Sequence, residues 1–162
     1  MKKTYKKFNP VKAVATFHQF TRNGILDKPA FPEKKRTDLR VLLIREELEE
    51  LEEAIHQKDL IEVADALTDI LYVTIGSFLE FGLGKIVPKL FKEVQRSNMT
   101  KFCKNEDEAK LQVEVYKTRN LDAGYYPVDD YFILYNKATG KTIKNRDYSQ
   151  PDLAKIIKKA QR

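Results

Sequence analysis

The amino-acid sequence predicts an all-α core, a four- to five-helix antiparallel bundle, followed by a C-terminal β-hairpin and a short terminal helix. Two observations support this fold class. Through residues 10–102, apolar side chains recur three and four positions apart, as in helices that bury one face. After residue 103 the pattern becomes an alternation around a glycine-containing turn, which is typical of a hairpin. We expect one domain, residues 1–162, with a core at about 10–102 and an extension at about 103–162.

The core helices are predicted at residues 10–22, 38–57, 60–82 and 85–99. Asn9 and Pro10 suit the N-cap and first position of the first helix. A loop with two prolines follows at residues 24–36. The connection before the third helix is short, which makes the second and third helices antiparallel neighbours, and Asp59 is the expected N-cap.

The extension is less regular. Residues 104–123 are polar and fit either a short helix or a strand. Residues 131–143 alternate and break at a KATG turn, which predicts a β-hairpin. Pro151 and Asp152 open a last amphipathic helix. The sequence assigns no role to residues 104–147.

Acidic residues mark one face of the third helix. Between positions 60 and 79 the only charged residues are Glu62, Asp65 and Asp69, which share a narrow face with Tyr72 at 100° per residue. The other positions are apolar or small on nearly every side, which is typical of a helix buried all round. Carboxylates on a buried face need compensation, and a bound cation is the simplest partner.

The second helix adds further carboxylates. Its apolar seam consists of Val41, Ile44, Leu48, Leu51 and Ile55. Glu47 and Glu50 share a flanking face that can meet Glu62 and Asp65 across the antiparallel pair. Oxygen-only ligands suit Mg²⁺ or Mn²⁺. Two structural alternatives stay open: a solvated acidic face, and a buried network paired with Arg40 or Arg45.

These residues resemble a known pattern. Glu46-Glu47-x-x-Glu50 followed by Glu62-x-x-Asp65 is similar to the EExxE…ExxD signature of the all-α nucleoside triphosphate pyrophosphohydrolases, the MazG-like proteins. That group is related to the phosphoribosyl-ATP pyrophosphohydrolases and the dimeric dUTPases. The resemblance extends to DILYV with Gly76, to EVQRSNMTK ending at Lys101, and to the fragment YSQPDL near the C-terminus. It covers about residues 10–102 well and the tail only in fragments.

The resemblance implies a role for each matching residue. The metal ligands would be Glu47, Glu50, Glu62 and Asp65, with Asp69 supporting them or adding a ligand. Glu46 would orient or deprotonate the attacking water, although its outward position also fits a solvent-exposed residue. Substrate contacts would come from His18 on the first helix, from Tyr72 on the carboxylate face, and from Arg96, Asn98 and Lys101 at the end of the fourth helix.

The implied activity is Mg²⁺-dependent hydrolysis of a nucleoside triphosphate to the monophosphate and pyrophosphate, with Mn²⁺ as a possible substitute. One alternative is a phosphoribosyl-nucleotide pyrophosphohydrolase. Another is a non-enzymatic helical domain that binds nucleic acid or a protein partner through its basic flanks. Relatives act as dimers or tetramers, and the apolar third helix agrees with a homodimer or homotetramer.

The net charge of +6 conceals a segregation along the chain. Residues 37–84 carry three basic and twelve acidic side chains, residues 1–36 carry ten and two, and residues 85–162 carry seventeen and ten. Acids that gather a metal beside phosphate-binding basic flanks explain this pattern, so we do not expect nucleic acid as a partner. Much of the basic run at residues 2–7 is expected to be a solvated terminus.

Cysteine usage and hydropathy indicate the compartment. The single cysteine, Cys103, excludes an internal disulfide framework and indicates a reducing environment. The first residues lack the apolar stretch of a secretory signal, and no uncharged apolar run reaches about 18 residues. We expect a cytoplasmic protein without a membrane partner.

Overall fold

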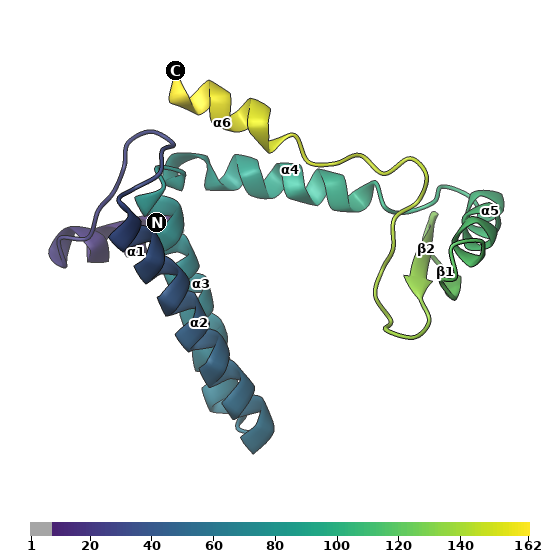
Figure 1. The fold of residues 1–162 in the computed structure, drawn as a ribbon, viewed down its shortest axis with the longest axis horizontal. Coiled ribbons are helices and arrows are strands. Elements are labelled where there is room, and N and C mark those ends of the chain that lie inside the picture. Colours follow the sequence, from purple (N-terminus) through teal and green to yellow (C-terminus); the bar gives the residue numbers. More distant parts are fainter. Residues whose placement is uncertain (1–7) are drawn as a thin grey trace, which may run out of the picture. The chain divides into compact units, whose positions relative to one another are not determined.

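The computed structural model describes residues 8–162, so the predicted solvated terminus at residues 2–7 lies outside the described residues. The fold class is confirmed: the described chain is mainly helical, with one antiparallel hairpin and a short helix near its end (Figure 1). The elements are α1 Pro10–Phe20, α2 Lys34–Gln57, α3 Leu60–Glu80, the 3₁₀ turn η1 Gly84–Ile86, α4 Val87–Met99, α5 Glu106–Lys117, β1 Ala123–Val128, β2 Tyr131–Asn136 and α6 Leu153–Gln161.

The chain forms two compact units. The first runs to Val87 and includes Ile157–Arg162, and the second is Pro88–Ile156. The description of residues 1–162 as one domain with an extension from residue 103 stays a prediction. Within the described residues, no single helix is long and apolar enough to cross a membrane, although the bent pair formed by α3 and residues 84–99 passes by length and composition.

The long hairpin of α2 and α3 dominates the first unit (Figure 1). Lys58 takes a left-handed conformation with φ of 58°, which ends α2 and turns the chain. Asp59 then caps α3, because its Oδ1 accepts hydrogen bonds from the backbone N–H of Ile61 at 2.9 Å and of Glu62 at 3.2 Å. The two helices are therefore antiparallel neighbours, as predicted.

Helix α1 packs against the second half of α3. The Asn9 side chain caps α1 by accepting from the Lys12 N–H at 3.0 Å, as predicted. Val14 of α1 lies in a small core with Ile75 and Leu79 of α3. This contact covers only part of α3, and its consequence is visible on the rest of the helix.

The prediction that α3 is buried all round is wrong for the single chain. Leu60 and Ile61 are each 79% exposed, and Leu71 is also exposed. The outer residues of the predicted α2 seam, Val41, Leu48 and Ile55, are exposed as well. Two neighbouring helices cannot surround a third, so an apolar surface remains along this hairpin.

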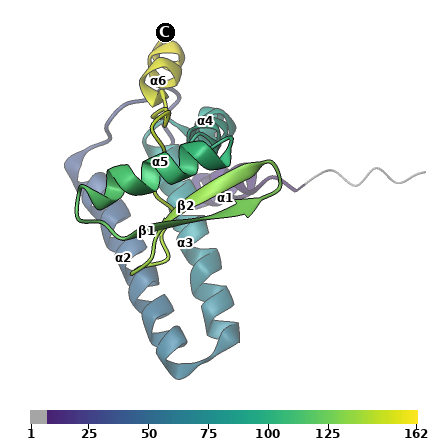
Figure 2. The same cartoon turned by 90° about the vertical axis from the view of Figure 1, so that its right-hand side faces the viewer.

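The second unit contains α5 and the hairpin (Figure 2). Its core is formed by Cys103, Ala109 of α5 and Leu134 of β2, all fully buried. The ambiguous stretch 104–123 contains α5 and therefore includes a helix.

The pairing of the hairpin differs from the prediction. Strand β2 pairs along its length with the preceding β1, with Val128 opposite Tyr131, whereas the following segment contributes only the bridge between Tyr135 and Thr142. The tight turn at residues 129–130 brings β1 alongside β2, and Asp129 accepts a positive φ of 48° there.

Candidate functional site

Two pairs of positions show the register of the α2–α3 hairpin. At its open end Arg36 of α2 forms an ion pair with Glu80 of α3. Near its turn Glu50 and Glu62 line the same depression. Between these levels the predicted carboxylates of α2 and α3 face one another, because both helices run straight through this region (Figure 1).

Glu47 is the centre of the carboxylate group. It is half-buried, and partial burial raises its pKa. Repulsion from Glu50, Asp69, Glu46 and Asp65 raises the pKa further, in that order of importance. Each of these acids is thus close enough to disfavour the ionised form of Glu47. The structure brings together carboxylates that the sequence placed on two separate helices.

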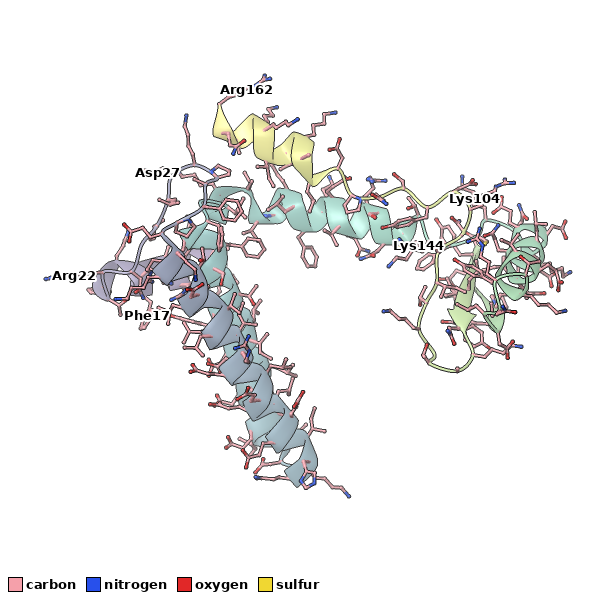
Figure 3. All side chains as sticks on the ribbon, in the orientation of Figure 1. Phe17, Arg22, Asp27, Lys104, Lys144 and Arg162 are labelled. Atoms are coloured by element: carbon pink, nitrogen blue, oxygen red, sulfur yellow. The ribbon has the colours of Figure 1, made fainter. Side chains whose placement is uncertain are left out.

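The remaining carboxylates are more accessible. Asp69 is half-buried, whereas Glu46, Glu50, Glu62 and Asp65 are exposed, and carboxylate oxygens are spread along the hairpin (Figure 3). An open depression of about 450 Å³ lies beside them, lined by residues of the α2 C-terminal turns and the α3 N-terminus. The lining residues are Glu50, Glu53, Ala54, Gln57, Asp59 and Glu62.

The chemistry of these donors fits a hard divalent cation. All of them are carboxylate oxygens, which Mg²⁺ and Mn²⁺ prefer, and their mutual repulsion is relieved by positive charge. Within residues 8–162, no group of three or more His, Cys, Asp or Glu side chains is already arranged around one point as a metal site. Most of these side chains are exposed and can rotate, so closure around a cation requires only rotamer changes.

The aromatic and imidazole candidates lie further along the same hairpin. Tyr72 follows Asp69 by about one turn of α3, and its ring meets that of Phe17 edge to face, with centroids 5.7 Å apart (Phe17 is labelled in Figure 3). His18 is 2% exposed, and its Nδ1 lies 3.3 Å from the Gly24 carbonyl oxygen. A contact between His18 and substrate stays a prediction.

The candidates at the end of α4 make local contacts within the second unit. Arg96 forms an ion pair with Glu93 at 2.8 Å and donates to the Gln150 carbonyl at 3.0 Å. Lys101 Nζ donates to Asn98 Oδ1 at 2.8 Å. The ion pair with Arg96 and a hydrogen bond from the Asp152 N–H lower the pKa of Glu93 to about 2. The contacts of these three candidates with substrate stay predictions.

Sequence reasoning missed a buried charge network at the open end of the hairpin. Glu80 is 1% exposed and meets both Arg36 and Arg40. The sequence offered Arg40 as a partner for the acids of residues 62–69, but the structure pairs it with Glu80. The available signal was an acid in the last turn of an apolar helix together with two arginines four residues apart on its neighbour.

Comparison with known proteins agrees with this site. A family described as phosphoribosyl-ATP pyrophosphohydrolase matches residues 14–98, which include α2, α3 and most of α4. An uncharacterized protein of Acanthamoeba polyphaga mimivirus is 29% identical over 149 residues, covering 87% of this chain. The chain spans 58% of that relative's length. On the family match, the chain belongs to the phosphoribosyl-ATP pyrophosphohydrolase family and has the pyrophosphohydrolase type of activity.

Proposed function

We propose that this pyrophosphohydrolase cleaves a nucleoside triphosphate between its α and β phosphates in the presence of Mg²⁺. One observation carries the proposal: the acids around Glu47 raise its pKa, and no basic residue contributes to that shift. Such a cluster is electrostatically costly unless a cation binds, and a metal-bound di- or triphosphate is a suitable counterpart.

The reaction requires water to attack the α-phosphorus while the bond from that phosphorus to the bridging oxygen breaks. The products are the nucleoside monophosphate and pyrophosphate, and the proton from water is released. A bound Mg²⁺ would neutralise phosphate charge and lower the pKa of its water. Glu47, Glu50, Glu62 and Asp65 would hold it, supported by Asp69.

Other residues would position the substrate and the water. Glu46 is exposed beside Glu47, where it can accept a proton from the attacking water. Lys101 and Arg96 would neutralise phosphate charge and Asn98 would hydrogen-bond the substrate, as charge-assisted donors do in phosphoryl transfer. The aromatic pair of Tyr72 and Phe17 offers a surface for a base or sugar.

The test is pyrophosphate release from a panel of NTPs and dNTPs, with Mg²⁺ and with EDTA, beside Asp65→Asn. We expect metal-dependent release that the variant reduces by at least about 10³-fold. The exposed Glu53→Gln, beside the same depression, is the matched control and keeps its activity. Equal release by wild type and Asp65→Asn contradicts the proposed metal ligands.

Two other functions are outcomes of the same experiment. The family description favours a phosphoribosyl nucleotide as a second candidate substrate. Release from that substrate alone, with none from the panel, replaces the first candidate by the second. Silence on both, with steeply salt-dependent nucleic-acid binding, supports a non-enzymatic role instead.

We also propose that a second copy of the chain covers the exposed apolar side of the hairpin. Val41, Leu48 and Ile55 form a heptad-spaced stripe on α2, and Leu67 and Leu71 are exposed on α3. Light scattering is expected to give a homodimer or a multiple of it. Leu48→Glu should shift the protein toward monomer, whereas Glu49→Lys beside it should not. A monomeric wild type at micromolar concentration contradicts this proposal.

A further inference from the structure

The network at the open end of the hairpin contains more positive than negative charge. Arg36 donates from Nε to Glu80 Oε2 at 2.9 Å and from Nη2 to Glu80 Oε1, so it engages both carboxylate oxygens. The hydrogen bond with Glu80 raises the pKa of Arg36. This two-point arrangement matches one guanidinium to one carboxylate. A second guanidinium beside it, that of Arg40, is therefore surplus.

Arg40 is buried without an adequate partner. Its side chain is 7% exposed, and its Nε lies 3.2 Å from Glu80 Oε1 without forming a hydrogen bond. Burial lowers the pKa of Arg40, and the Arg36 charge lowers it further against the attraction of Glu80. A buried charge that shares a carboxylate already engaged by another arginine is costly to the fold. Such a charge indicates a missing anion.

The neighbours of Arg40 do not supply that anion. The Gly24 carbonyl can only accept, so His18 Nδ1 donates to it and Nε2 carries a lone pair in the neutral ring. Burial lowers the pKa of His18, although the Gly24 hydrogen bond opposes this, so the ring is neutral at pH 7. The imidazole therefore contributes no negative charge.

Gly76 allows these two side chains to meet α3. A Cβ at this position would lie 2.9 Å from both Arg40 Nη1 and His18 Nε2. The missing side chain of Gly76 thus lets a guanidinium edge and an imidazole nitrogen reach one point on the helix. That edge is a ready-made donor to an oxygen ligand.

We propose that Arg40, with His18 and Gly76, forms a second oxyanion site that binds a phosphate group. Arg40 precedes Glu47 by seven residues of α2, so the site lies about 10.5 Å along the helix from the carboxylates. The phosphate comes from one of two sources: a group at the far end of the same nucleotide, or a free phosphate. The site goes beyond the proposed hydrolysis, and its test needs no turnover.

The first measurement is the thermal midpoint of the full chain in EDTA with inorganic phosphate, against chloride at equal ionic strength. Phosphate raises the midpoint of wild type, because a ligand that binds only the folded state stabilises it. Arg40→Met loses this increment, whereas Arg45→Met, which removes an exposed arginine from the same helix, keeps it. An equal phosphate increment in Arg40→Met overturns the site.

A second measurement protects the test against a misfolded variant. In wild type, the NMR signal of the Arg40 Nε–H is assigned and followed during titration with phosphate. We expect a saturable shift, and Arg40→Lys, which keeps charge but loses the planar fork, should bind phosphate at least about tenfold more weakly. An Arg40 signal that does not move at saturating phosphate overturns the proposal.

Ribose 5-phosphate identifies the source. If it binds at least about tenfold more tightly than inorganic phosphate and a nucleotide competes with it, the phosphate belongs to the substrate. Equal affinity without competition indicates a free anion, and both results support the site. Asp65→Asn must keep the phosphate effect, so loss of hydrolysis and loss of this site are distinguishable.

Discussion

Glu47 and Glu80 are two glutamates on the facing sides of one helical hairpin, yet their surroundings are opposite. Glu80 is almost fully buried and meets two guanidinium groups. Glu47 is half-buried, and only other acids contribute to the electrostatic part of its pKa shift. One level of the hairpin therefore carries excess positive charge and the other carries excess negative charge.

The difference separates a structural charge from a functional one. Removing a partner of a buried ion pair destabilises a fold strongly, because the other charge stays desolvated. Removing one member of a repulsive cluster costs the fold little, because the loss of charge relieves its neighbours. Substitution at the two glutamates should therefore affect different properties of the protein.

The largest expected effect is on turnover at Glu47. Glu47→Gln should reduce metal-dependent pyrophosphate release by at least about 10³-fold, because it removes a charged ligand. Its stability in EDTA should equal or slightly exceed that of wild type, as measured by urea unfolding. Unfolding of this variant in metal-free buffer would show that Glu47 supports the fold rather than the reaction.

The largest effect on stability is expected at Glu80. Glu80→Gln leaves Arg36 and Arg40 buried without a counter-charge, which should cost about 3 kcal/mol in the free energy of unfolding. Urea unfolding at pH 7 measures this loss. The exposed Glu53→Gln serves as control and should leave the midpoint unchanged. A Glu80→Gln protein as stable as wild type would mean that the network contributes little to the fold.

A smaller effect is expected at Gly76. Gly76→Ala places a Cβ 2.9 Å from Arg40 Nη1 and His18 Nε2, and this overpacking should cost about 1–3 kcal/mol. The matched control is Gly24→Ala, because nothing lies within 4 Å of the added methyl group there. The two variants are compared by thermal unfolding. Equal midpoints would show that the two side chains move aside freely.

The smallest effect is on pH dependence. Because the pKa of Glu47 is raised, the folded chain holds its proton more tightly than the unfolded chain does. The stability due to this group is present at low pH and is lost as pH rises from the ordinary value of about 4.3 through the raised value. Glu47→Gln should flatten this fall, measured by urea unfolding at a series of pH values in EDTA. A steeper fall in the variant would contradict the sign of the shift.

Local signals were sufficient for most of the secondary structure. Asn9 and Asp59 identified two helix starts, because caps depend on residues two and three positions away. The register of the β-hairpin was different: the sequence recognised the strand at 131–136 but chose the wrong partner strand. Strand pairing depends on contacts across a turn, and two turn-containing partners were available on either side.

The candidate site follows the same division. Periodicity placed the carboxylates of α2 and α3 on facing surfaces, because the geometry of a helix is the same in any fold. Periodicity also suggested that α3 is covered all round, which the single chain cannot achieve. Coverage depends on how many neighbours pack against a helix, and a one-dimensional pattern does not contain that number.

The sequence by itself determined the helical hairpin, its two caps and the acidic faces, since each arises from residues within a few turns of one another. Only the tertiary structure decided that Arg40 shares Glu80 with Arg36, that His18 is buried, and that the missing side chain of Gly76 lets Arg40 and His18 approach α3. These contacts join residues on three helices. Their energies depend on desolvation and on distances between helices, which exist only after the chain has folded.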